Sequence, residues 1–491
     1  MTTTHSTPSP EAKPEPKDHI VVTSHKIKLS NKALAYTATC GTMVLKEEHE
    51  KDGEAKGEKP RAILFFVAYT LDGVTALANR PLTFSFNGGP GSSSVWLHLG
   101  LAGPKRVVTN EMGQPGAPPY ALTDNEFTLL EKSDLVFIDP VGTGYSRMLD
   151  GEKVKEFHDY KRDLDSVGEF IRLYTTRNRR WGSPKYIIGE SYGTTRAAGL
   201  AGLLQEKYGM YLNGLMLISC ALDFQLIRFD TGNDLPPVLY LPTYAATAWY
   251  HQRLSATEQK KPLHTLLDEV ETFAAGEYAT ALFQGRALSK TDESRVVEKL
   301  SRYTGLTTEY LRATRLRIDI QRFCKELLRS NGKTVGRLDS RFTGTERDSA
   351  GEKFEFDPSY AAILGAYSTC FNQYVRGDLN FETDRPYHTL ASLYMHWGWN
   401  DFTNRYVSVS DTLRQAIATN PHLRVFVANG YYDFATPHFA SDYSFNHLAI
   451  NPVQAANIQT HYYEAGHMMY VHQPSLKALA TALKQFIAPR K

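Results

Sequence analysis

A serine flanked by two glycines stands out in the stretch YIIGESYG, residues 186–193. A stiff apolar run leads into it, and an alanine- and leucine-rich stretch, residues 194–206, follows. In a strand–Gly-x-Ser-x-Gly–helix turn the serine projects above a sheet, and the glycines make room for the tight crossing. The following helix brings a partial positive charge to the place where an oxyanion would form. Ser191 is therefore a candidate nucleophile; a chance motif in a chain with 35 glycines is the alternative.

A serine hydroxyl needs a neighbouring base, and that base needs an orienting carboxylate. When the nucleophile lies on such a strand-to-helix turn, the three residues follow one another along the chain in the order Ser, then Asp or Glu, then His. Asp433 follows the strand-like stretch 424–430, and His467 follows the strand-like stretch 460–466, whose last residue, Gly466, is expected to allow a tight turn. These two residues are the candidate acid and base. Nearby rivals lack a preceding strand combined with a glycine-bearing turn: Asp442, His438, His447, His461 and His472.

Acyl transfer also needs amide donors for the developing oxyanion. One donor is expected from the backbone N–H of Tyr192, the residue after the nucleophile, and the other from a glycine-rich loop after an earlier strand. The stretch FNGGPGSSS, residues 86–94, supplies such a loop. It lacks the Gly-Lys-Ser/Thr ending of a phosphate loop, so a simple hairpin turn is the remaining alternative.

Strand-like and helix-like stretches alternate around these residues. A helix is predicted over residues 157–177 from its apolar period. The alternation predicts right-handed crossovers and a largely parallel sheet. Three earlier strand-like stretches, joined by charged or glycine-bearing links, are expected to be antiparallel. The predicted strands are residues 19–27, 33–45 and 61–71 in the antiparallel part, and residues 81–86, 133–140, 185–190 and 213–219 in the parallel part.

The character of the chain changes over residues 221–400, which are mainly helix-like. Strand character returns at residues 423–430, and a helix over residues 475–487 closes the chain. We therefore expect a discontinuous core, residues 19–220 and 401–491, interrupted by a mainly helical insertion that lies over the sheet. The helix-like stretches of the insertion are residues 263–283, 294–305 and 308–330.

The charge balance, 55 Lys and Arg against 53 Asp and Glu, gives no electrostatic sign of nucleic acid or an anionic membrane as partner. No uninterrupted apolar run approaches the roughly 20 residues of a spanning helix. Residues 1–18 are polar and proline-rich, without the apolar region of a secretory signal, and are expected to be disordered. No metal-binding spacing such as HExxH and no dinucleotide fingerprint is present, so no cofactor is expected.

The cysteines do not form a disulfide framework, because they are few and widely scattered. The chain also contains no Asn-x-Ser/Thr acceptor for glycosylation. Together these features predict a cytoplasmic location, with secretion or export to a periplasm by a route not visible in the sequence as the alternative. The four cysteines are Cys40, Cys220, Cys324 and Cys370.

Five blocks in order, FNGGPGSSS, IDPVGTGYS, IIGESYG, NGYYDFATP and EAGHMMYVHQP, resemble the serine carboxypeptidases. The resemblance runs from about residue 65 to the C-terminus. It implies an α/β-hydrolase core, with a mixed, mostly parallel sheet flanked by helices, and a helical cap over the active site. It also implies Ser191 as nucleophile, Asp433 as acid and His467 as base, with Gly89 and Tyr192 as the oxyanion donors.

The resemblance further implies recognition of a free α-carboxylate by Asn87 and Glu190. An amide donates to a carboxylate directly, whereas a glutamate does so only when protonated, and a second acid nearby raises its pKa. Here the position of the family's second acid is Leu101, which puts strict C-terminal specificity and an acidic optimum in doubt. His98, a helical turn earlier, is a hypothetical contributor to this subsite; an ordinary core or surface histidine is the alternative.

Two further positions depart from the family pattern: Ser85 replaces a tryptophan, and Ser92 replaces a cysteine, so that the family's disulfide is absent. The leading prediction is a serine peptidase that releases C-terminal residues, with a free-C-terminus peptide as its partner. An esterase or acyltransferase with the same triad is the alternative. A non-catalytic binding protein on the same fold is less favoured, because binding alone does not need all three triad residues.

Overall fold

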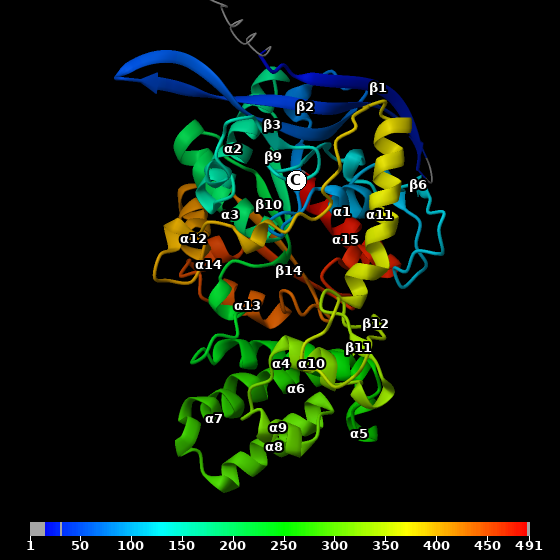
Figure 1. Ribbon diagram of the computed structural model, residues 1–491, viewed down its shortest axis with the longest axis vertical. Coiled ribbons are helices and arrows are strands. Elements are labelled where there is room, and N and C mark those ends of the chain that lie inside the picture. Colours follow the sequence, from blue (N-terminus) through cyan, green and yellow to red (C-terminus); the bar gives the residue numbers. More distant parts are fainter. Residues whose placement is uncertain (1–14, 30–31, 489–491) are drawn as a thin grey trace, which may run out of the picture.

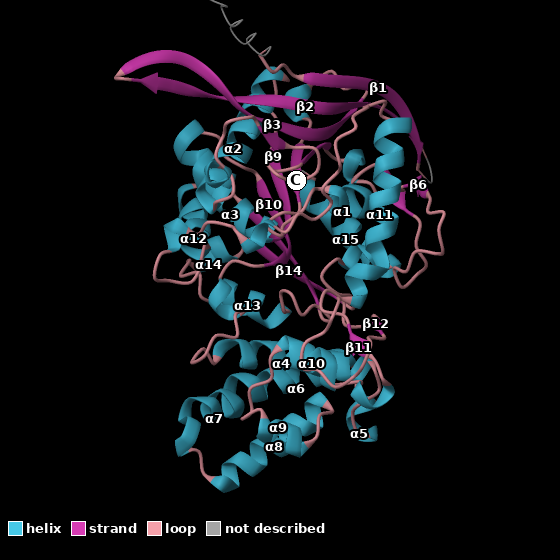
Figure 2. Cartoon of the chain, viewed as in Figure 1, coloured by secondary structure: helices cyan, strands magenta, loops and turns pink. Residues whose placement is uncertain are grey.

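The computed structural model describes residues 15–29 and 32–488. In this part of the chain a ten-stranded sheet carries helices on both faces, and a helical lobe lies at one end (Figures 1 and 2). The strands of the large sheet are β1 (His19–Lys28), β2 (Ala33–Lys51), β3 (Glu54–Leu71), β4 (Leu82–Phe86), β7 (Asp134–Ile138), β8 (Arg147–Met148), β9 (Lys185–Ser191), β10 (Gly214–Cys220), β13 (Arg424–Gly430) and β14 (Ile458–Tyr463). Two small hairpins are formed by β5 (Lys105–Val107) with β6 (Leu122–Asp124), and by β11 (Thr334–Val335) with β12 (Thr343–Gly344).

The strand order is β1-β2-β3-β7-β4-β9-β10-β13-β14, with β8 paired to β3. The strands from β7 to β14 are parallel, whereas β1, β2 and β3 pair antiparallel with their neighbours. All residues of β4, β7 and β10 are buried, as expected for parallel strands covered on both faces. The predicted mixed, mostly parallel sheet is confirmed, and its parallel strands bring their carboxyl ends to one edge.

The helices are α1 (Val95–Leu97), α2 (Tyr160–Arg177), α3 (Tyr192–Tyr208), α4 (Leu235–Tyr250), α5 (Ala256–Gln259), α6 (Leu263–Phe273), α7 (Ala279–Gln284), α8 (Lys290–Thr304), α9 (Thr308–Ala313), α10 (Ile320–Glu326), α11 (Pro358–Gly377), α12 (Ser410–Thr419), α13 (His438–Asn446), α14 (Pro452–Ala455) and α15 (Gln473–Ile487). Helices α2, α3 and α12 cover one face of the sheet through a shared apolar core. Helices α11 and α15 cover the other face through a second core, and Figure 1 shows the two groups on opposite sides of the strands. In α2, for example, Leu164, Val167 and Ile171 recur at helical spacing and point into the first core.

Helices α4 to α10 form the lobe at the lower end of Figure 1 around a core of their own. Helix α11, in contrast, contributes Ile363, Phe371 and Tyr374 to a core of the sheet. The division into a core and an insertion over residues 221–400 stays a prediction, and this packing suggests that the core resumes at α11, well before residue 400. The reason is that α11 carries apolar residues complementary to the sheet, which a count of helix-like segments does not reveal.

The tail prediction for residues 1–18 lies mostly outside the described residues, which begin at Glu15. Glu15 forms an ion pair with Lys46, and the Asp18 carboxylate accepts a hydrogen bond from Val44 N at 2.8 Å. Within the described ranges, no helix combines the length and apolar composition that a bilayer-crossing segment needs.

Two local predictions from the sequence were wrong. The charged stretch 46–60, predicted to be a link, continues both β2 and β3 and reverses at Asp52 and Gly53, whose φ angles of 57° and 79° suit a two-residue hairpin turn. The stretch 308–330, predicted to be helix-like throughout, is interrupted between α9 and α10, where Arg315 and Leu316 have φ angles of 52° and 65°. Leu316 is buried in the lobe core, so tertiary burial outweighs local helix preference there.

Candidate active site

Ser191 lies at the end of β9, and α3 begins at the next residue. Its φ of 60° and ψ of −129° lie in a region that costs a non-glycine residue about 1–3 kcal/mol. A Cβ on Gly189 would lie 2.2 Å from Gly193 O, and a Cβ on Gly193 would lie 3.0 Å from Phe86 O. The two glycines therefore permit the close crossing of strand and helix that turns Ser191 out of the sheet.

Asp433 and His467 follow the ends of two neighbouring parallel strands, β13 and β14. Their side chains meet, with His467 Nδ1 2.8 Å from Asp433 Oδ2. Asp433 is fully buried, and its Oδ1 accepts hydrogen bonds from Ala435 N at 2.7 Å and Thr436 N at 3.0 Å. These bonds fix the carboxylate, which in turn orients the imidazole.

The environment of His467 favours its charged form. Burial opposes the charge, but the negative charge and hydrogen bond of Asp433 outweigh burial and, with Glu190, raise the pKa of His467. Because Asp433 accepts at Nδ1, that nitrogen carries the proton and Nε2 is left to exchange a proton with a nucleophile. This is the arrangement that a general base for Ser191 requires.

Ser191 and His467 both line one cavity of about 590 Å³. The Ser191 hydroxyl forms no hydrogen bond to His467 among the described contacts, which is common before a substrate closes such a site. Gly88, Gly89 and Glu190 line the same cavity. The structure therefore brings the predicted nucleophile, base, oxyanion loop and one carboxylate-binding residue to a common space.

The glycine loop of residues 88–89 lies against the first turn of α3. A Cβ on Gly88 would be 2.5 Å from Tyr192 N, so only a glycine permits this approach. The N–H groups of Gly89 and Tyr192 donate to no other group that the structure describes, which leaves both for an oxyanion. Behind the loop, the Arg196 guanidinium donates to Asn87 O at 2.8 Å and holds the backbone in place.

Glu190 is almost fully buried beside the nucleophile. Asn87 Nδ2 donates to its Oε1 at 2.9 Å, and the Tyr470 hydroxyl donates to its Oε2 at 2.5 Å. Burial raises the pKa of Glu190 to about 7, although the charge of His467 and these two hydrogen bonds oppose the rise. Near neutral pH the side chain is therefore divided between its charged and neutral forms.

Asn87, predicted to bind the substrate carboxylate with Glu190, is not among the residues that line the cavity. Its Oδ1 accepts from Leu97 N at 3.1 Å, while its Nδ2 serves Glu190. The structure thus brings Glu190 to the cavity and turns Asn87 toward Glu190 and the backbone.

His98 and Leu101 lie on a five-residue π-helical turn, His98–Ala102, and both are completely buried. The ring of His98 stacks on Phe137 with centroids 4.2 Å apart, and its Nε2 lies 2.7 Å from the Tyr69 hydroxyl. Burial lowers the pKa of His98 to about 3. The hypothesis that His98 contributes to the substrate subsite is therefore wrong: it is a core histidine.

Sequence reasoning missed Thr436 and Tyr470, which touch the predicted site residues. The Thr436 hydroxyl donates to Asp433 Oδ2 at 2.7 Å and lies 3.2 Å from His467 Nδ1. Thr436 follows Asp433 by three positions in NGYYDFATP, and Tyr470 follows His467 by three positions in EAGHMMYVHQP. Their closeness to the triad motifs was the sequence signal that could have identified them. Nothing in the sequence alone indicated which side chains turn toward Asp433 or Glu190.

Gly466 has a role other than the predicted tight turn. A Cβ there would lie 2.4 Å from Leu338 O, and the neighbouring His467 N donates to this carbonyl at 2.6 Å. The glycine therefore admits a segment from between β11 and β12, which fixes the loop that carries the base.

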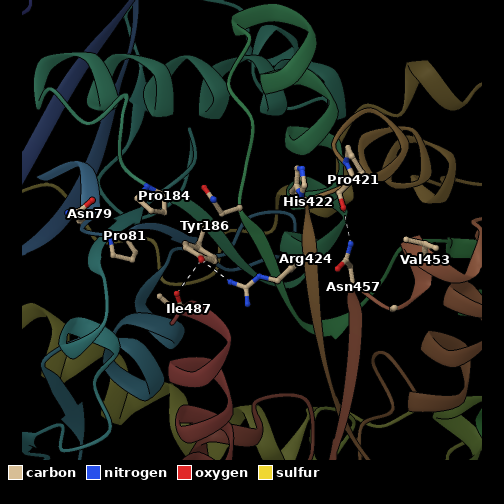
Figure 3. A pocket seen from close by; sticks show the side chains of 12 residues that line it. Asn79, Pro81, Pro184, Tyr186, Pro421, His422, Arg424, Val453, Asn457 and Ile487 are labelled. Atoms are coloured by element: carbon tan, nitrogen blue, oxygen red, sulfur yellow. Dashed lines mark hydrogen bonds between the residues drawn. The ribbon is translucent and has the colours of Figure 1, made fainter. Parts of the chain in front are cut away.

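A larger cavity, of about 880 Å³, lies near the amino ends of β9 and β13 (Figure 3). In it Arg424 donates to the Tyr186 hydroxyl at 3.0 Å, and Tyr186 donates to Ile487 O at 3.2 Å (Figure 3). Its lining contains no carboxylate, serine or cysteine. Despite its size, it lacks the groups for nucleophilic chemistry that the smaller cavity contains.

The four cysteines are free thiols, each buried. Among the residues that the structure describes, no three His, Cys, Asp or Glu side chains are grouped so that they could hold a metal ion.

The sheet order, the helices on both of its faces and the sharp turn at Ser191 define an α/β-hydrolase. Within that class the chain belongs to the serine carboxypeptidase family, whose sequence profile matches residues 54–483. The fold is similar to that of a prohormone-processing carboxypeptidase from Saccharomyces cerevisiae, with a TM-score of 0.56 and 16% identity over 92% of this chain and 91% of that one.

Two curated relatives match shorter segments. The pheromone-processing carboxypeptidase kex1 of Aspergillus niger is 34% identical over 134 residues, 27% of this chain and 20% of that protein. Serine carboxypeptidase-like 33 of Arabidopsis thaliana is 25% identical over 152 residues, 30% of each protein. The matches thus span less than a third of either relative's length.

The relatives correct the predicted cytoplasmic location. They are proteins of secretory compartments rather than of the cytoplasm, and those from Aspergillus niger and Yarrowia lipolytica are both named for pheromone processing. The prediction used scattered cysteines and missing glycosylation acceptors. The cysteines do not report a compartment, because four thiols that are buried inside the fold need no reducing surroundings to stay unpaired.

Proposed function

We propose that this chain is a serine carboxypeptidase in activity as well as in family, releasing C-terminal residues from peptides. The observation that carries the proposal is the contact between His467 Nδ1 and Asp433 Oδ2, 2.8 Å, in the cavity that Ser191 also lines. A buried acid, an oriented base and a serine on a strained turn are the parts that acyl transfer by a serine needs.

In the proposed reaction Ser191 Oγ attacks the scissile carbonyl carbon while His467 Nε2 takes its proton. The carbonyl oxygen becomes an oxyanion and accepts hydrogen bonds from Gly89 N–H and Tyr192 N–H. Collapse of this intermediate breaks the C–N bond, and His467 returns the proton to the departing amine. Water then repeats the two steps on the acyl-enzyme, releasing the shortened peptide and regenerating the serine. Asp433 stays ionised and stabilises the imidazolium.

Glu190 accounts for the preference of the proposed enzyme for a free C-terminus. It lies beside Ser191, and burial raises its pKa to about 7, so its neutral form is populated at and below neutral pH. A neutral carboxyl does not repel the terminal carboxylate of a peptide as a charged one would. Peptides with a free C-terminus are accordingly proposed to bind better as the pH falls below 7.

The experiment compares blocked dipeptides that differ only in a free or an amidated C-terminus, with wild type and Ser191→Ala. The proposal predicts hydrolysis of the free acid, much slower hydrolysis of the amide, and loss of both in S191A. It also predicts covalent labelling of Ser191 by a fluorophosphonate. Labelling without peptide hydrolysis would instead favour an esterase or acyltransferase, and an unlabelled protein would favour a binding role.

The esterase or acyltransferase alternative has one observation in its favour. Leu101, at the position of the family's second acid, is completely buried among apolar side chains, so it offers nothing to a terminal carboxylate. A small ester panel measured beside the dipeptides separates the two activities, because they share the acyl-enzyme and differ in the acyl donor.

A further inference from the structure

Arg337 lines the cavity of Ser191 and His467. Among the described residues that line this cavity, it is the one with a lysine or arginine side chain. Its guanidinium forms no hydrogen bond and no ion pair with any described group, although it is partly buried. Most partly buried arginines of this chain have partners; Arg317, for example, pairs with Asp234, and Arg61 pairs with Glu152. A guanidinium that has no partner in the chain and lines a cavity is free to pair with an anion from outside the chain.

The backbone of Arg337 is held rigidly beside the triad. Its N–H donates to Asp357 Oδ1 at 3.1 Å, and its carbonyl accepts from Phe434 N at 3.0 Å. The next residue, Leu338, accepts from His467 N at 2.6 Å. The positive charge of Arg337 partly opposes the rise in the pKa of His467. The guanidinium therefore stands on a segment fixed to the loops that carry the acid and the base.

The acidic groups that line this cavity are satisfied by other partners. Asp357 accepts from the N–H groups of Arg337 and Leu338 and from Ser359, through both its N–H and its hydroxyl. Glu190 accepts at both of its oxygens, from Asn87 and Tyr470. Neither carboxylate forms an ion pair with Arg337, so the positive charge remains available to a ligand.

We propose that Arg337 binds a carboxylate of the substrate peptide, an inference that rests on the proposed peptidase function. A guanidinium matches a carboxylate with two parallel N–H donors. The need for such a group follows from the site itself, because Asn87 is turned away from the cavity and Leu101 is apolar. The carboxylate belongs either to the C-terminus of the peptide or to an acidic side chain next to the scissile bond.

The test measures binding rather than turnover, with the full chain carrying Ser191→Ala and isothermal titration calorimetry as the readout. Four blocked tripeptides form two matched pairs: a C-terminal acid against its amide, and Asp against Asn beside the scissile bond. Adding Arg337→Gln should weaken the carboxylate member of one pair about tenfold or more, while its neutral partner changes less than about twofold. A loss in the first pair assigns the terminal carboxylate, and a loss in the second assigns the side chain.

Two control variants distinguish loss of carboxylate binding from a general defect. Arg337→Lys keeps the charge and should retain most of the preference, which a folding defect would not allow. Arg295→Gln removes an arginine of the helical lobe that pairs with Glu277 and does not line this cavity, so its binding should match that of S191A alone. Equal weakening of all four peptides by R337Q, no weakening, or no binding of any carboxylate peptide to S191A overturns the proposal. Hydrolysis by the wild type is measured separately, so failure of the peptidase function is distinguishable.

Discussion

The Tyr470 hydroxyl donates a 2.5 Å hydrogen bond to Glu190 Oε2. With Leu101 at the position of the family's second acid, Glu190 faces a neutral hydroxyl rather than a carboxyl. Its pKa of about 7 is therefore raised chiefly by burial, with the charge of Asp433 as a lesser cause. Burial thus raises the pKa of Glu190, as the family resemblance expects a second carboxyl group to do, and Glu190 titrates near neutral pH.

Replacing Tyr470 by Phe removes the donor that favours the charged form of Glu190. Because that hydrogen bond lowers the pKa of Glu190, its loss should raise the pKa by about one unit. The pH at which KM for a free-acid dipeptide doubles should move upward by the same amount. Steady-state KM measured across the pH range checks this.

Tyr367→Phe is the matched control, because Tyr367 is buried near Glu190 without a hydrogen bond to it. Its pH profile should overlay that of the wild type. A downward or absent shift in Y470F would mean that Glu190 does not govern binding of the free acid.

The raised pKa of Glu190 also affects stability. In the unfolded chain a glutamate titrates near 4.3, so between about pH 4.5 and pH 7 the folded state binds a proton that the unfolded state has lost. The free energy of unfolding should therefore fall as the pH rises through this window. The raised pKa of His467 acts in the same direction, since its contribution is present below about pH 6.5 and is lost as the pH passes its folded value.

Glu190→Gln isolates the first contribution, because it removes the titration and keeps the shape. Relative to E190Q, the wild type should lose about 1–3 kcal/mol of unfolding free energy between about pH 4.5 and pH 7.5. Urea unfolding at these two pH values measures the difference. Parallel pH dependence in the two proteins would show that Glu190 has an ordinary pKa.

Thr436 supports the acid that orients His467. Thr436→Val removes the hydroxyl that donates to Asp433 Oδ2 at 2.7 Å while preserving volume. The loss of a hydrogen bond to a charged group predicts a fall in kcat of about tenfold or more, with KM little changed, because the bond positions the carboxylate that stabilises the imidazolium formed during reaction. Thr436→Ser keeps the hydroxyl and should restore kcat; a KM effect alone would assign Thr436 to substrate binding.

The sheet was predictable because its strands are short apolar runs bounded by turns, and their mostly parallel orientation follows from the strand–helix alternation. The pairing of β2 with β3 was expected, but their full length was missed, because charged residues such as those of 46–51 extend a strand when its partner continues beside it. The break at Arg315 and Leu316 was missed because burial of Leu316 is a tertiary effect. Local sequence patterns predict that a helix or strand is present, whereas tertiary packing determines where it begins and ends.

The placement of the candidate residues Ser191, Asp433 and His467 was predictable, because motif and strand end coincide at each of them. Asn87 was expected to bind the substrate carboxylate, whereas in the structure its side-chain amide donates a hydrogen bond to Glu190. The direction in which a side chain points is not encoded in a sequence motif. Arg337 was missed for a different reason. It comes from a segment between two short strands, far from every motif in the sequence, and reaches the site only because Leu338 contacts the loop of His467.

Arg196 links the core to the oxyanion loop: it is fully buried, pairs with Asp163 at 2.8 Å and donates to Asn87 O. Arg196→Met should cost about 3–5 kcal/mol of unfolding free energy, because Asp163 is left as a buried charge. Adding Asp163→Asn should recover much of that stability, but not kcat, since Asn87 O still lacks its donor and the amide of Gly89 is less well held. Urea unfolding and steady-state kinetics on the single and double variants separate the two effects. Recovery of kcat together with stability would show that Arg196 serves folding alone.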